Sequence, residues 1–223
     1  MEILKYMWNN LGTIGMRTVE HLSIVGVAVT LAVICGVALG VYIARRPKVA
    51  QVVLYIGTIV ITIPSIALFG LLIPVLSLIG QGIGWLPAVI AVYIYSMAPI
   101  VRNTYTALID LDPALRDAAT GMGMNPSQRL WRVELPNALP VIMAGIRIAV
   151  VMNIGITAIA AYIGAGGLGT FISRGITQTD IRQLATGALS VSVLAVAVDY
   201  ALLAVQRWLS PKGLALAAPE PAH

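Results

Sequence analysis

The chain has 223 residues, of which 59% are hydrophobic and only 10% are charged. Soluble domains are about a quarter charged, so this composition excludes an ordinary soluble enzyme and indicates an integral membrane protein. The length suits one domain of about five or six membrane spans, because each span needs roughly 20 apolar residues. The formal net charge of +5 does not indicate nucleic-acid binding, since most of the positive charge flanks apolar segments.

The chain offers few residues for catalysis or metal binding. Cys35, the single cysteine, lies in an apolar run and can form no internal disulfide, so we interpret it as a small packing residue. His21 and His223 stand near opposite ends of the chain and suggest neither a metal site nor a catalytic base. No GxxxxGK sequence followed by Ser or Thr occurs, so the chain carries no P-loop. We expect a non-catalytic protein that binds no cofactor itself.

Residues 1–18 are expected to form an interfacial segment, with aromatic side chains such as Trp8 at the level of the lipid headgroups. Charged residues interrupt this stretch, so we expect no cleaved signal peptide. The first span is expected at about Leu22–Ala44. Gly36 and Gly40 form a GxxxG pair within it, which permits close approach of another helix.

The next apolar run, Val49–Ile79, would measure roughly 45 Å as one helix and exceeds a ~30 Å hydrocarbon core. Pro64 and Pro74 fall within it, and a proline removes a backbone donor and kinks a helix. We therefore expect a second span that is kinked at Pro64. Because a broken helix leaves backbone groups for protein or water to satisfy, Thr62, Pro64 and Ser65 are candidates for lining a transport pathway. The alternative is a purely structural kink.

Three further spans complete an all-α membrane fold with five transmembrane helices. They are expected at about Leu86–Leu108, Ala138–Ile163 and Leu184–Leu209. We assign residues 1–18 to the interfacial segment, 19–212 to one transmembrane domain, and the Ala/Pro-rich residues 213–223 to a disordered tail.

The distribution of basic residues predicts the orientation in a cytoplasmic membrane. Five crossings with the N-terminus outside place nine basic residues inside: Arg45, Arg46, Lys48, Arg102, Arg116, Arg129, Arg132, Arg207 and Lys212. Four lie outside: Lys5, Arg17, Arg174 and Arg182. The excess of inside charge satisfies the positive-inside rule, so the C-terminus and residues 112–136 are expected in the cytoplasm.

Residues 112–136 form a polar island that begins with two helix-start signals. Asp112-Pro113 combines an N-cap with a proline at the first helical position. Asn125-Pro126 repeats this signal, and Gln128 stands where it can complete a capping box. Two short capped helices are therefore expected to project from the membrane.

The first of these helices should end at Gly121-Met122-Gly123, and the second before Pro136. Met122 and Met124 would lie at the bend, where their adaptable side chains suit a partner's groove. The alternative is a plain cytoplasmic loop, but such loops seldom carry this much capping.

The spacing inside the island resembles the EAA loop of the membrane subunit of bacterial ATP-binding-cassette (ABC) importers. That loop has the form EAA, three residues, Gly, nine residues, Ile, any residue, Leu, Pro; here Asp117 replaces the Glu and Val133 the Ile. The resemblance implies that residues 112–136 are a coupling segment that fits a cleft on an ATP-hydrolysing subunit. The implied coupling residues are Asp117, Ala118, Ala119, Gly121, Met122, Gly123, Met124, Leu135 and Pro136.

Other stretches resemble the glycine betaine/carnitine/choline branch of these MetI-like permeases. They are residues 62–70, 102–105 and 163–169. The resemblance implies import of a quaternary-ammonium compatible solute, with two ABC ATPases that carry ATP and Mg, a second permease copy or paralogue, and an external solute-binding protein. Quaternary ammonium groups are usually recognised by aromatic cages, and only 6% of this chain is aromatic, so selectivity is expected in the binding protein.

Three other functions stay open from the sequence. The permease could carry another small solute, such as an amino acid. A stand-alone secondary transporter or channel would leave the coupling segment unexplained and should show an inverted repeat, which we do not find. A non-transporting membrane scaffold is the third.

Two further features are candidates for function. Gly164, Gly166, Gly167 and Gly169 form an outside loop that follows a span rather than a β-strand, so it is not a dinucleotide site. It is either a flexible turn or a gate or docking surface for a substrate-delivering protein, with Arg174, Asp180 and Arg182 as polar contacts.

Arg147 and Asp199 are charges inside two different spans, each roughly 12–14 Å from the cytoplasmic end. Charges within a membrane are costly and usually paired or facing water. We expect an Arg147–Asp199 ion pair that holds the last two spans in register; independent snorkelling or pairing across a subunit interface is the alternative.

Overall fold

A computed structural model describes residues 2–209, and every regular element among them is helical. The α-helices are α1 (Glu2–Asn9), α2 (Leu11–Ala44), α3 (Pro47–Thr62), α4 (Ser65–Ser77), α5 (Trp85–Ile109), α6 (Pro113–Gly121), α7 (Pro126–Arg129), α8 (Leu135–Ile159), α9 (Gly169–Thr177) and α10 (Ile181–Leu209). A π-helical turn, Leu130–Glu134, precedes α8, and a 3₁₀ turn, Ala160–Ile163, follows it. The expected tail at 213–223 lies outside the described residues.

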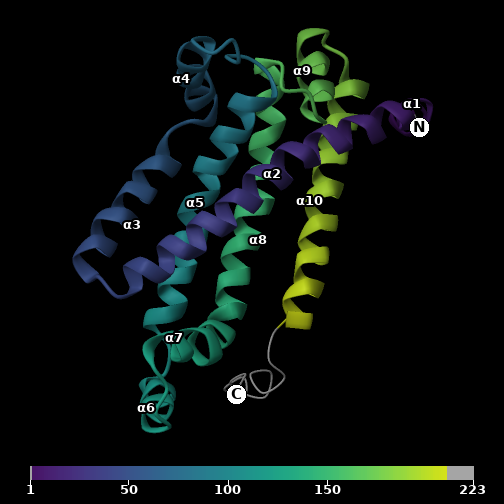
Figure 1. The fold of residues 1–223 in the computed structure, drawn as a ribbon. Coiled ribbons are helices and arrows are strands. Elements are labelled where there is room, and N and C mark those ends of the chain that lie inside the picture. Colours follow the sequence, from purple (N-terminus) through teal and green to yellow (C-terminus); the bar gives the residue numbers. More distant parts are fainter. Residues whose placement is uncertain (1, 210–223) are drawn as a thin grey trace, which may run out of the picture.

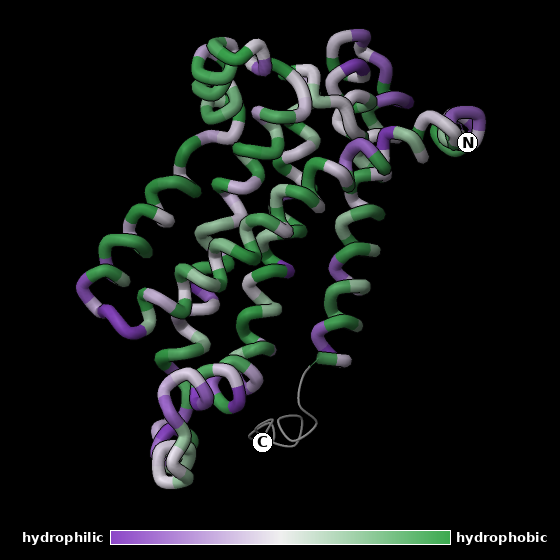
Figure 2. Tube along the Cα trace, viewed as in Figure 1, coloured by the Kyte–Doolittle hydropathy of each residue, from purple (hydrophilic) through white to green (hydrophobic). Residues whose placement is uncertain are grey.

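Four helical segments are long and apolar enough to cross a membrane: α2, α5, α10 and the continuous stretch Pro126–Ile163. The helices α3 and α4 pass the same test together but are bent by 98° at the break between them, so the described chain has up to five spans. Apolar residues cover the long helices, and polar residues gather towards the two ends of the molecule (Figure 2).

The helices α2, α5 and α8 form the centre of the bundle, with α3 outside α5 and α10 outside α8 (Figure 1). The connection between α2 and α3, the helices α6 and α7, and the C-terminal end of α10 lie at one end of the molecule. The N-terminus, α4 and α9 lie at the other. Seven of the basic residues assigned to the inside stand on or beside these elements: Arg45, Arg46, Lys48, Arg116, Arg129, Arg132 and Arg207. Lys212 lies outside the described residues.

Small residues allow the central helices to pack closely. A methyl group on Gly36 would come within 2.9 Å of the Ile100 side chain, and one on Gly40 within 2.5 Å of the Thr104 side chain. The GxxxG pair is therefore the contact surface of α2 against α5. A polar link adds to this core, because the buried Asn153 amide on α8 donates to the Ser96 hydroxyl on α5 at 2.8 Å.

Two expected boundaries were wrong. The first long helix begins at Leu11 rather than at Leu22, so only α1 is separate from it. Its first turns tolerate charge because Arg17 and Glu20 pair at 2.7 Å. The helical stretch that begins with α7 does not end before Pro136, because the π-helical turn follows directly after Arg129 and leads into α8. Pro136 lacks an N–H and would crowd the carbonyl four residues earlier in a regular helix, and the wider turn accommodates it.

Candidate functional site

The coupling segment is shaped by side chains that cap its helices. The Asp112 carboxylate accepts the Ala114 N–H at 2.9 Å at the start of α6. At the start of α7, the Asn125 side chain accepts the Gln128 N–H at 2.9 Å, and the Gln128 side chain accepts the Asn125 N–H at 3.0 Å. Both starts carry proline at the first helical position. These caps satisfy N–H groups that a helix start leaves free.

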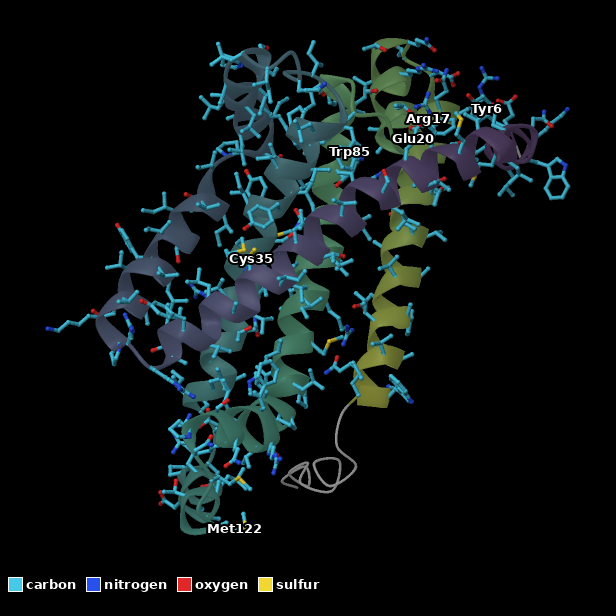
Figure 3. All side chains as sticks on the ribbon, in the orientation of Figure 1. Tyr6, Arg17, Glu20, Cys35, Trp85 and Met122 are labelled. Atoms are coloured by element: carbon cyan, nitrogen blue, oxygen red, sulfur yellow. The ribbon has the colours of Figure 1, made fainter. Side chains whose placement is uncertain are left out.

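The tip of this segment presents apolar side chains to the surroundings. Met122 is 69% exposed and lies at the far end of the molecule, away from the long helices (Figure 3). Trp131, on the π-helical turn that follows α7, is 68% exposed. Asp117 and Ala118 are also exposed, whereas Ala119 is buried. An exposed apolar surface at the end of a capped rigid element is typical of a protein contact site.

Gly123 turns the chain between α6 and α7. Its φ is +77°, a left-handed conformation that residues with a side chain rarely adopt, yet open space surrounds its Cα. Glycine is therefore needed here for its backbone freedom. Gly121 has neither a positive φ nor a close neighbour. Met124 is partly buried, as are Leu135 and Pro136 at the start of α8.

Glu134, the last residue of the π-helical turn, is a residue of this site that was not predicted from the sequence. Its side chain is buried and lies among the basic residues Arg45, Arg116 and Arg129, beside a cavity of about 330 Å³. One signal could have revealed it: Glu134 is the only acidic residue between Asp117 and Asp180, and it stands directly before the Leu-Pro of the motif.

The glycine loop at the opposite end is packed against α2 and α8. Gly164, Gly166 and Gly167 all have positive φ. The Glu20 carboxylate on α2 accepts the Gly167 N–H at 2.9 Å, and a methyl group on Gly169 would come within 1.9 Å of the Ala158 carbonyl. The loop is therefore tightly fitted, unlike the flexible turn that was one of its two readings.

Two neighbouring contacts fix this end of α2. His21 is fully buried, and its Nε2 lies 3.0 Å from the Ile154 carbonyl on α8. Arg17 donates to the Glu20 carboxylate at 2.7 Å, and both side chains lie beside α9 in Figure 3. The first turns of α2, the glycine loop and α8 therefore form one packed unit at this end.

Asp180 caps the start of α10 and pairs with Arg182. Its carboxylate accepts the Arg182 backbone N–H at 2.9 Å and lies 3.1 Å from the guanidinium. These hydrogen bonds lower the pKa of Asp180 to about 2. The Arg182 guanidinium also lies 6.0 Å from the centre of the Tyr6 ring on α1. Arg174 is exposed at the end of α9.

A largely apolar cavity of about 580 Å³ lies between α3, α5 and α8. At one end of it Arg102 donates to the Thr58 hydroxyl at 2.8 Å. Its wall reaches Ile61, one residue before the predicted pathway residues Thr62, Pro64 and Ser65, which lie at the break between α3 and α4. The Tyr95 hydroxyl donates to the Ile63 carbonyl at 2.5 Å and so satisfies one backbone group that the break releases.

Arg147 on α8 and Asp199 on α10 are in direct contact. The guanidinium makes two parallel hydrogen bonds to the carboxylate, each 2.9 Å long. Gln206 extends this link, because its side chain accepts from Arg147 at 3.3 Å and donates to the Pro140 carbonyl at 3.1 Å. The polar contacts therefore join the last two long helices.

A known protein family matches most of this chain. The family described as "Binding-protein-dependent transport system inner membrane component" matches residues 36–213. The chain belongs to this family. It is therefore the permease subunit of an ABC importer, a multi-pass protein of the inner membrane.

The chain is similar over nearly its whole length to several curated permeases. The osmoprotectant import permease protein OsmW of Salmonella typhimurium is 56% identical over 214 residues, which are 96% of this chain and 100% of that protein. The choline transport system permease protein OpuBB of Bacillus subtilis is 39% identical over 95% of both chains. The glycine betaine/carnitine/choline permease OpuCB of the same species is 38% identical over 96% of both.

A solved structure shares the fold of this permease. A chain of the MetNI methionine ABC transporter, in an inward-facing conformation, aligns with a TM-score of 0.77 and 25% identity over 95% of this chain and 98% of its own length. The overall helical arrangement is thus that of an importer permease.

Proposed function

We propose that this permease forms part of the translocation pathway for a quaternary-ammonium compatible solute such as glycine betaine, carnitine or choline. The observation that carries the substrate class is the 56% identity to an osmoprotectant import permease over its full length. Two further relatives at 38–39% identity are named for choline and for glycine betaine, carnitine and choline. The methionine transporter, at 25% identity, is a more distant relative, so an amino acid is the less favoured substrate.

Two ATPase subunits, which carry ATP and Mg, would dock on the coupling segment. The exposed Met122 and Trp131 supply apolar contact area, and the capped starts of α6 and α7 keep that surface in one shape. The inner-side excess of basic residues supports placing this segment in the cytoplasm and the N-terminus outside.

A second permease copy or paralogue would face the cavity between α3, α5 and α8. That cavity is lined by residues of α2, α3, α5 and α8 of this chain, so a second subunit facing it would supply the remaining walls of the pathway. The break at Pro64 and its neighbours Thr62 and Ser65 would lie beside this pathway. An external binding protein would deliver the solute to the end that carries the glycine loop, Gly164–Gly169.

In this mechanism the coupling segment turns closure of the two ATPases into movement of the membrane helices. The bonds at Asp112, Asn125 and Gln128 keep α6 and α7 from deforming when they are pushed. Helices that move as rigid bodies would then open the pathway to one side of the membrane at a time, which is alternating access.

Uptake by the reconstituted importer tests this function. The chain is purified with its ATPase and binding protein, inserted into proteoliposomes, and supplied with labelled glycine betaine, carnitine, choline or methionine. ATP-dependent uptake of at least one quaternary ammonium compound, and little of methionine, is the expected result. Uptake that persists without the ATPase would refute the importer mechanism, and preferential uptake of methionine would refute the substrate class.

A further inference from the structure

Glu134 is the one carboxylate that is buried among the described residues; its exposed fraction is 5%. A buried charge is costly unless paired and hydrogen-bonded. It lies on the π-helical turn near the end of the coupling segment, directly before α8. The residues that pair with this carboxylate therefore indicate its role.

Three guanidinium groups converge on Glu134 from three different parts of the chain. Arg129, at the end of α7, donates to Oε1 at 3.0 Å. Arg116 on α6 places its Nε 3.5 Å from the same oxygen. Arg45, which follows the last residue of α2, lies 4.0 Å from Oε2. The carboxylate thus lies between the helices α6 and α7 of the coupling segment and the inner end of α2.

Two of these arginines also contact residues other than Glu134. Arg116 also donates to the Leu108 carbonyl in the last turn of α5. Arg129 donates to the Thr120 hydroxyl on α6 at 3.3 Å. The two helices of the coupling segment are therefore bound to each other, to the end of α5 and to the end of α2 through contacts that meet at one side chain.

We propose that Glu134 is a positioning residue that makes the coupling segment and the inner ends of α2 and α5 move as one body when the ATPases close. The inference rests on the proposed function and deepens it. Without the carboxylate that lies between them, three like charges would face one another, and like charges at close range repel. The coupling segment could then move without carrying α2.

A distance measurement tests this directly. Spin labels are placed on the exposed Ala38 of α2 and the exposed Ala114 of α6, in a Cys35→Ser background and in the full complex with ATPase and binding protein. The distance between the labels is expected to be the same with and without ATP. In E134Q it should change on ATP binding. A change in the otherwise unaltered complex, or none in E134Q, would overturn the proposal.

Coupling of hydrolysis to transport gives a second readout. In E134Q, glycine betaine imported per ATP hydrolysed should fall roughly fivefold or more, the low end of a coupling between two sites, while assembly with the ATPase is retained. D110N is the matched control: Asp110 is an exposed carboxylate that precedes the coupling segment and is not among the residues that surround Glu134. An unchanged ratio in E134Q, or a loss of import only in proportion to lost assembly, contradicts the role.

If E134Q does not fold, R45Q tests the same proposal. It removes only the α2 link and leaves the bonds between α6, α7 and Glu134 in place. It should lower import per ATP in the same direction by a smaller factor, and a wild-type ratio would count against the proposal. An unsubstituted complex that binds no ATPase would instead refute the proposed function.

Discussion

The backbone angle of Gly123 sets the direction in which α7 leaves α6. A residue with a Cβ pays roughly 1–2 kcal/mol in this left-handed region, and a β-branched residue more. We expect Gly123→Val to abolish ATP-driven uptake, because the apolar tip would point elsewhere, while membrane insertion stays intact. Uptake in proteoliposomes and the yield of membrane-inserted protein measure the two effects.

Gly121→Ala is the matched control for that substitution. Gly121 lies two residues earlier in open space and has no positive φ, so alanine should be accommodated with near-normal uptake. Normal uptake in Gly123→Val would show that the turn is not needed for coupling.

Asp180 gives the start of α10 a dependence on pH. Its pKa is lowered from 3.8 to about 2, so the native state favours the ionised carboxylate more than the unfolded state does. That contribution to stability is fully present above about pH 4 and is lost as the pH falls through about 2. Hydrogen-exchange protection at the start of α10, relative to the intrinsic exchange rate at each pH, should therefore fall over this range, and Asp180→Asn should remove most of that change.

At the scale of elements, local signals were read well from the sequence. The caps at Asp112 and Asn125 and the turn at Gly123 depend on residues within three or four positions of one another, so the sequence contained all the information they need. The 98° bend between α3 and α4 did not follow from Pro64 alone. A proline marks where a helix breaks, whereas the angle depends on distant packing, including the Tyr95 contact with Ile63.

The link between α8 and α10 is a second element-scale property. Arg147→Gln or Asp199→Asn alone should reduce the amount of assembled complex, because each leaves a charge in the membrane without its partner. The exchange Arg147→Asp with Asp199→Arg should restore part of that loss. Size-exclusion profiles of the detergent-solubilised complex measure it; an exchange that never restores assembly would argue against the pair as the link.

At the scale of the whole molecule, hydropathy predicted which helices are long and apolar enough to cross a membrane, because a bilayer imposes length and composition on every helix that crosses it. Contacts between segments far apart in the sequence produce no comparable pattern in the sequence. The Glu20–Gly167 bond joins residues 147 positions apart, and Arg45 meets Glu134 from the other end of the same long helix. These pairings depend on how the helices assemble, so the sequence alone could not disclose them.

The uninterrupted length of α2 also constrains how this protein can vary. Glu20 and Arg45 are about seven helical turns apart, so they project from nearly the same side of a single rod. One residue inserted between them would rotate one end against the other by about 100°. The helix is thus held in a fixed rotation by contacts at both ends. After such an insertion Glu20 could keep its contact with Gly167, or Arg45 its contact with Glu134, but not both. Insertions near Gly80, in a connecting turn, would leave this helical phase untouched.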